Sequence, residues 1–218
     1  MFRNRTETGR RLADRLRHLK HAAPVVLAIP RGGVPVAVPI ASALDAPLDL
    51  LLARKLGAPG QPELALGAVV EGDPPQTVLN ERIVREFGIL PAAIAEEAAR
   101  ELETIARRRR RWLHGRPAIP TRGRTAIVVD DGVATGATVR AALSALSRAG
   151  AARRVLAVPV AAYSTAEALR RLCEEVVVLC EPDDFQSVGA HYRDFRQLED
   201  DEVAALLNEQ AGRHRMPR

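Results

Sequence analysis

Apolar residues occur in short runs that alternate with amphipathic stretches along most of the chain. Each run ends at glycine, proline or charged residues, which is typical of strands buried in a sheet. The predicted strands are Val25–Pro30, Leu48–Lys55, Leu64–Val70, Thr125–Asp131, Arg154–Ala162 and Glu175–Pro182. The segments between most of these runs have helical spacing of their apolar residues.

The predicted helices are Met1–Leu16, Val34–Leu44 (despite Pro39), Pro91–Leu113, Thr135–Ala149, Ser164–Cys173 and Glu199–Gln210. Pro91–Leu113 is the clearest of them. Its proline stands in the first turn, where the missing N–H costs little, and its glutamates precede its arginines, which complements the helix dipole. Gly57–Pro62 and Gly115–Arg124 are predicted as loops because glycine and proline punctuate them.

Strands that alternate with helices indicate an α/β fold, with a parallel sheet flanked by helices. The length predicts a single domain over residues 1–218, with a helical insert at 72–118. Ligands of such sheets bind at the carboxyl ends of the strands. We therefore expect Arg31–Gly33, Arg54–Lys55 and Asp130–Thr138 to lie along one edge of the molecule.

Composition narrows the class of protein. Apolar residues make up 47% of the chain and the formal net charge is +5, a small excess that suits an anionic ligand without implying nucleic acid. Cys173 and Cys180 are too few for a disulfide framework or a zinc site, and we interpret them as buried hydrophobes in a reducing compartment. The N-terminus lacks the apolar core of a signal peptide, and Val155–Tyr163 is too short to span a bilayer. These patterns predict a cytoplasmic protein without a membrane segment.

The segment with the clearest candidate ligand-binding residues is Ala126–Thr138, AIVVDDGVATGAT. Asp130 and Asp131 end a buried strand, and ionised carboxylates there suit a vicinal diol or a hydrated magnesium ion. The loop Gly132–Thr138 leads into a helix N-terminus, where free N–H groups attract phosphate. No lysine-containing phosphate loop or GxGxxG motif is present. The residues therefore predict a site for a phosphorylated ribose.

VVDDGVATGAT resembles the signature with which type I phosphoribosyltransferases bind phosphoribosyl pyrophosphate (PRPP). The resemblance implies that Asp130 and Asp131 hold the ribose hydroxyls and contribute to catalysis. It also implies that the loop holds the 5-phosphate, through Gly132, Val133, Ala134, Thr135, Gly136, Ala137 and Thr138. The expected cofactor is Mg²⁺, contacted by Asp130 and Asp131 mostly through ribose hydroxyls or water.

AIPRGGVPVA is similar to the pyrophosphate loop of the same family. Arg31, Gly32 and Gly33 would then bind pyrophosphate, in a loop that in relatives often contains a cis peptide bond. Arg54 and Lys55 resemble a basic pair that several members direct at pyrophosphate, and we count both among the catalytic residues. The following stretch, Gly57–Gly67, would be a lid that excludes water from the reaction.

Residues 181–198 resemble the hood of purine-type members, where an aromatic ring stacks on the base and a later aspartate binds metal. Phe185 and Val160 would contact the acceptor, and Asp194 would bind metal. Core packing of Phe185, Tyr192 and Phe195 is an equal alternative, and His191 is as well explained by packing as by proton donation.

Two differences from the pattern of this family concern the acceptor. Many 6-oxopurine members have an acid where this chain has Ala134, and a lysine on the next strand, where this chain has none. A hypoxanthine or guanine acceptor is therefore not expected. The prediction is a PRPP- and magnesium-dependent transferase, with homodimers common among relatives. The alternative is a regulatory protein that binds PRPP or a nucleotide without transferring it.

The run Arg107–Arg111 could suit nucleic acid. On a helix, however, five consecutive residues spread around the circumference and form no single stripe. Glutamates one to three turns earlier, Glu96, Glu97, Glu101 and Glu103, can pair with some of these arginines. We therefore predict a solvated helix surface and no nucleic-acid partner.

Overall fold

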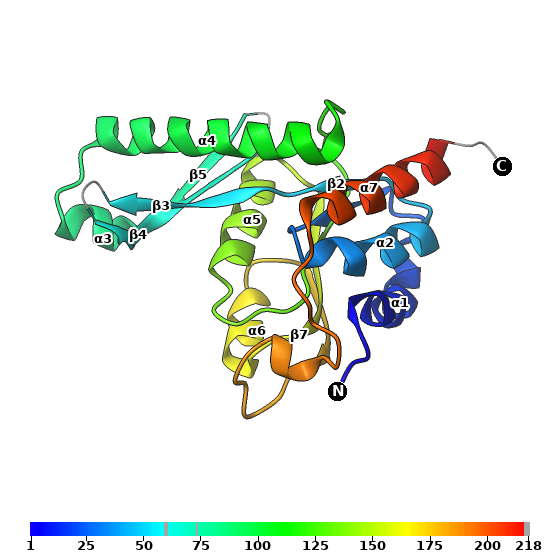
Figure 1. Ribbon diagram of the computed structural model, residues 1–218. Coiled ribbons are helices and arrows are strands. Elements are labelled where there is room, and N and C mark those ends of the chain that lie inside the picture. Colours follow the sequence, from blue (N-terminus) through cyan, green and yellow to red (C-terminus); the bar gives the residue numbers. More distant parts are fainter. Residues whose placement is uncertain (59–60, 73, 216–218) are drawn as a thin grey trace.

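The computed structural model describes residues 1–58, 61–72 and 74–215. Within these residues, five parallel strands form the main sheet in the order β2-β1-β6-β7-β8 (Figure 1). They are β1 (Pro24–Ala28), β2 (Leu48–Leu50), β6 (Thr125–Val129), β7 (Arg153–Val160) and β8 (Glu175–Cys180). Ala28 of β1 is in register with Val129 of β6, so their carboxyl ends meet at one edge. The predicted α/β fold is confirmed.

Helices cover both faces of this sheet, as Figure 1 shows. One face carries α1 (Arg5–Leu16), α2 (Gly33–Leu44) and α7 (Asp200–Arg215), and the other α5 (Ala137–Arg148) and α6 (Tyr163–Leu169). Alternate residues of β6 divide between the two apolar clusters. Ile127 and Val129 pack toward the first group of helices, and Ala126 and Val128 toward the second. Because both faces of the strands are buried, successive residues are all apolar and form unbroken apolar runs in the sequence.

A second, antiparallel sheet projects from the body (Figure 1). It consists of β3 (Ala53–Ala58), β4 (Gln61–Val70) and β5 (Gln76–Leu79), and is followed by α3 (Glu81–Glu86) and α4 (Pro91–Leu113). The long helix α4 lies along β3 and β4. Its predicted bounds are confirmed at both ends, with the proline in its first turn.

The predicted strand Leu48–Lys55 is wrong as a single element. The chain leaves the parallel sheet after Leu50, and Ala53 begins β3 in the other sheet. Leu50, Leu51 and Leu52 are all buried across this break. Because burial continues, the hydrophobic pattern does not indicate where the chain changes sheets.

The predicted loop Gly57–Pro62 is largely strand. β3 continues to Ala58 and β4 begins at Gln61. Pro59 and Gly60, which are also part of the lid expected over Gly57–Gly67, lie outside the described residues. Ala58 pairs with Gln61 across the two strands, so strand residues occupy most of the stretch that the sequence indicated as a loop.

Two expectations drawn from composition concern the cysteines and the membrane. Cys173 and Cys180 are free thiols, but only Cys173 is buried, while Cys180 is half-buried. Among the residues that the structure describes, no helix is both long enough and apolar enough to cross a bilayer.

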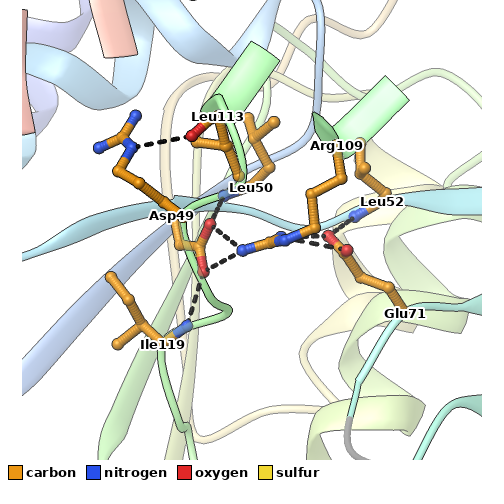
Figure 2. Close-up of polar contacts among 8 residues, drawn as sticks. Asp49, Leu50, Leu52, Glu71, Arg109, Leu113 and Ile119 are labelled. Atoms are coloured by element: carbon orange, nitrogen blue, oxygen red, sulfur yellow. Dashed lines mark hydrogen bonds and ion pairs between the residues drawn. The ribbon is translucent and has the colours of Figure 1, made fainter. Parts of the chain in front are cut away.

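A buried ion-pair network joins the projecting part to the main sheet (Figure 2). Arg109 of α4 donates through Nη2 to both carboxylate oxygens of Asp49 in β2, at 2.7 and 2.8 Å. Through Nη1 it donates to both oxygens of Glu71, at 3.0 and 3.1 Å. Asp49 also accepts from the backbone N–H of Ile119, and Glu71 from that of Leu52. One guanidinium thus connects α4, β2 and the end of β4.

The prediction that the early glutamates of α4 pair with the arginine cluster is wrong. Glu96 and Glu97 pair with Arg100, and Glu101 pairs with Arg54 of β3. Within the cluster, Arg109 turns inward to Asp49 and Glu71, and Arg111 pairs with Asp200 of α7 at 2.9 Å. Acids on neighbouring elements are closer to these guanidinium groups than acids on their own helix.

Glu71 makes the stability of the fold depend on pH. Burial raises its pKa from 4.5 to about 7, although the charge of Arg109 opposes the shift. Between these values the folded chain holds a proton that the unfolded chain releases, so the free energy of unfolding should fall as pH rises through this window. We expect a loss of up to about 3 kcal/mol, measured by urea unfolding at several pH values. Glu71→Gln should flatten that dependence; an unchanged slope would contradict the assignment.

Candidate functional site

Asp130 and Asp131 directly follow β6, at the carboxyl edge of the main sheet. The backbone N–H of Asp131 donates to Asp130 Oδ1 at 2.8 Å. Burial raises the pKa of Asp130 well above its ordinary range, and the adjacent charge of Asp131 raises it further. A pair of carboxylates that is this costly to ionise favours a cation or hydroxyl donors as its ligand.

Two residues from distant parts of the chain hold Asp131. Arg5 at the start of α1 donates through Nε to Asp131 Oδ2 at 2.8 Å. The Tyr192 hydroxyl donates to the Asp131 carbonyl oxygen at 2.6 Å. The sequence did not single out Arg5, and it indicated Tyr192 only as a packing residue. No motif connects either residue with the acids, because 126 and 61 residues separate them from Asp131.

The loop Gly132–Thr138 begins with a segment that is anchored to the neighbouring strand and helix. The Val133 N–H donates to the Val160 carbonyl of β7 at 2.8 Å. The Thr165 hydroxyl of α6 donates to the Ala134 carbonyl at 2.7 Å. These bonds hold the loop in place without using its own N–H groups from Ala134 onward.

The second half of the loop forms the N-terminus of α5. Gly136 precedes the helix with a φ of 73°, a left-handed conformation that favours glycine, and has no side chain to cap it. The residues around it, Ala134, Thr135, Ala137 and Thr138, are exposed. The first N–H groups of α5 have no partner within the helix, so they and the two hydroxyls can receive a tetrahedral anion.

The loop after β1 lies against the acid pair. An added Cβ at Gly32 would stand 1.9 Å from Asp131 Oδ2, and one at Gly33 would stand 2.5 Å from the Val129 carbonyl oxygen. Only glycine allows this close approach. The Pro30–Arg31 peptide bond is cis, as the resemblance implied for this loop. The structure therefore brings Gly32 together with Asp131, and Gly33 together with the end of β6.

The Arg31 side chain has partners on another segment of the chain. Its Nη1 donates to the Leu198 carbonyl oxygen at 2.6 Å and lies 3.9 Å from Asp200 Oδ1. The residues just before and at the start of α7 therefore hold the guanidinium. An anion bound at Gly32 and Gly33 would meet the backbone of this loop first.

Arg54 and Lys55 lie within β3, not at the end of a strand of the parallel sheet as the sequence indicated. The Arg54 Nε donates to Glu101 Oε2 of α4 at 2.6 Å. Lys55 is exposed. The structure thus directs Arg54 toward α4.

The hood segment, residues 181–198, packs on the loop Gly132–Thr138. An added Cβ at Gly132 would stand 2.5 Å from Val188 Cγ1 and 2.9 Å from Val160 Cγ1. Val160 is fully buried, so in this arrangement it has no surface for an acceptor. Phe185 is half-buried and stacks on the ring of His191, with 5.7 Å between the centroids.

The donors at the acid pair fit a magnesium ion better than a metal that needs a protein cage. Asp130 and Asp131 offer hard carboxylate oxygens, and Mg²⁺ is usually held by one or two carboxylates, waters and substrate phosphates. Over residues 1–58, 61–72 and 74–215, no three His, Cys, Asp or Glu side chains gather as a metal site. Asp194, exposed on the hood segment, therefore does not join the pair in such a cluster.

Comparison with known proteins gives concordant matches. A family model described as phosphoribosyl transferase domain matches residues 5–194. Two proteins of Mycobacterium tuberculosis, from strains CDC 1551 and H37Rv, are provisionally named phosphoribosyl transferases. Each is 46% identical over 208 residues, which are 95% of this chain and 46% of the relative. The chain therefore spans about half the length of these relatives. The crystal structure of TT1426 from Thermus thermophilus superposes with a TM-score of 0.83 and 44% identity, covering 96% of this chain and 99% of that one.

Proposed function

Because this chain belongs to the phosphoribosyl transferase domain family, we propose that it transfers ribose 5-phosphate from PRPP to a small-molecule acceptor and releases pyrophosphate. One observation carries the proposal. The acid pair, the loop into α5 and the glycines after β1 meet at the carboxyl ends of β1 and β6, with Gly32 in contact with Asp131. A diol, a phosphate and a pyrophosphate can therefore be bound side by side.

In this mechanism the chain binds PRPP at three points. The 5-phosphate accepts hydrogen bonds from the N–H groups at the start of α5 and from the hydroxyls of Thr135 and Thr138. Asp130 and Asp131 accept hydrogen bonds from the ribose hydroxyls. The backbone of Gly32 and Gly33 receives pyrophosphate. These contacts place C1 of the sugar for an attacking acceptor, and much of the rate enhancement comes from this positioning.

The reaction breaks the bond from C1 to pyrophosphate and forms a bond from C1 to the acceptor nucleophile, which loses its proton. The sugar gains positive charge on the way, and the carboxylates of Asp130 and Asp131 favour that charge. Magnesium, when bound, supplies charge neutralisation for the leaving pyrophosphate. Arg31, Arg54 and Lys55 are proposed to assist there. Arg54 would first have to exchange its contact with Glu101 for pyrophosphate.

The acceptor side of the proposal rests on fewer residues. Phe185 offers an aromatic face at the hood segment, whereas Val160 would need the hood segment to move before it met an acceptor. Ala134 offers no acid for a purine nitrogen. We propose an acceptor other than a 6-oxopurine. We also propose that the protein is a homodimer in the cytoplasm, where a reducing environment suits the free thiols.

A second candidate function is a regulatory protein that binds PRPP without transferring it. The covered Val160 favours this reading, because it leaves the acceptor one contact fewer. Incubating the protein with PRPP, magnesium and a panel of nucleobases and other amine acceptors separates the two. Pyrophosphate release that depends on one acceptor supports transfer. PRPP binding without release from any acceptor supports the regulatory reading, and absence of PRPP binding would exclude both.

A further inference from the structure

Arg5 is held between the acid pair and the hood segment. Its Nε donates to Asp131 Oδ2 at 2.8 Å, and its Nη1 donates to the Arg196 carbonyl oxygen at 3.0 Å. Its Cζ lies 3.9 Å from the ring centroid of Phe195. The side chains of Arg5 and Asp131 are only 11% and 16% exposed, so this ion pair is more strongly shielded from water than a surface pair.

The backbone on either side fixes where Arg5 lies. Asn4 caps α1, since its side-chain oxygen accepts from the Glu7 N–H at 2.9 Å. The Phe2 N–H donates to the His191 carbonyl oxygen at 2.7 Å, and the ring of Phe2 packs on Tyr192. Figure 1 shows this N-terminal end beside the hood segment. These contacts attach the chain just before α1 to the hood segment, independently of the Arg5 contact with Asp131.

Asp131 is correspondingly restrained on three sides. Arg5 binds Oδ2, the Tyr192 hydroxyl binds the backbone carbonyl, and the Gly32 backbone lies against the carboxylate. A carboxylate held in this way presents its other oxygen, Oδ1, in one direction. A hydrogen bond to a ribose hydroxyl needs that fixed direction, because its strength falls steeply when the angle is poor.

We propose that Arg5 is a positioning residue for ribose recognition, which acts by holding Asp131 with Oδ1 directed at the sugar; this inference rests on the proposed PRPP site. Arg5 itself does not touch the sugar. Its link to Phe195 and Arg196 makes the acid's position depend on the hood segment, so an ordered hood and a ribose-competent Asp131 occur together.

Isothermal calorimetry with ribose 5-phosphate and with magnesium PRPP tests this role. Arg5→Gln should weaken both affinities about tenfold, the value of one charge-assisted hydrogen bond. Affinity for magnesium pyrophosphate, which has no ribose, should not change. Arg5→Lys should restore part of the loss. Arg10→Gln, which removes the same charge from an exposed position of α1, is the matched control and should bind like the unaltered protein.

A double-mutant cycle separates positioning from a general effect on the hood segment. In an Asp131→Asn background, Arg5→Gln should cost no more than about twofold further affinity, because Arg5 acts through that carboxylate. A full loss in both backgrounds would overturn the proposal, as would unchanged or tighter binding by Arg5→Gln. If Arg5→Gln does not fold, Arg5→Lys measured in both Asp131 backgrounds decides in its place. Failure of the unaltered protein to bind either sugar phosphate would instead refute the PRPP site itself.

Discussion

Replacing Asp130 and Asp131 together by asparagine is expected to weaken PRPP binding by at least about 100-fold, since two hydrogen bonds to charged groups are lost. The fold should persist, because the change relieves the burial and mutual repulsion that raise the pKa of Asp130. The measurement is calorimetric titration with magnesium PRPP, beside a thermal unfolding curve. A large loss of affinity in a variant that still unfolds cooperatively is the expected combination.

The matched control for this double variant is Glu96→Gln with Glu97→Gln. It also converts two adjacent carboxylates to amides, but on the surface of α4, where they pair with Arg100. The control should bind PRPP like the unaltered protein. If the Asp130 and Asp131 variant also kept its affinity, the acid pair would not be the ribose site, and the proposed function would lose its central observation.

Arg109→Met is expected to lower the free energy of unfolding by about 3–5 kcal/mol, the usual cost of removing one partner from a buried ion pair. The variant leaves the carboxylates of Asp49 and Glu71 buried beside one another, without the guanidinium that bridges them in Figure 2. Urea unfolding followed by circular dichroism measures the loss. Arg108→Met, an exposed neighbour in the same arginine run, should change stability little.

A compensating variant tests the cause of that loss. Adding Asp49→Asn and Glu71→Gln to Arg109→Met removes the uncompensated charges, and part of the stability should return. No recovery would mean that the loss comes from packing around Arg109 and not from the buried carboxylates. PRPP affinity should follow the fraction of folded protein in each case, because these residues lie in the link between α4 and the main sheet.

The inward position of Arg109 is indicated by the spacing of apolar residues along α4, although the run of five arginines made it hard to recognise. Arg109 stands four residues after Ile105 and three before Trp112, both of which are buried, so it shares the inward face of α4. This spacing places Arg109 on the inward face, so the prediction of a solvated surface for the arginine run is wrong at this residue. The spacing does not predict the partners, because Asp49 and Glu71 approach only when β2 and β4 are in place.

The sequence by itself determined the features that depend on neighbouring residues. Apolar runs and their flanks predicted the parallel sheet, and a proline and a charge gradient predicted α4 to its end residues. The segment Asp130–Thr138 predicted where the acid pair and the loop before α5 would lie. These features depend on backbone periodicity and on hydrogen-bonding groups within one turn or strand. They can therefore be predicted from residues that are close together in the sequence.

Only the tertiary structure decided which distant side chains meet. The Arg5 contact with Asp131, the turning of Arg54 to Glu101, the burial of Val160 beneath the hood segment and the change of sheet after Leu50 all depend on how separate elements pack. Such contacts have no sequence period, and each charged group could pair with any of many acids or bases. Packing selects one partner by bringing it within hydrogen-bonding distance and excluding water from the pair.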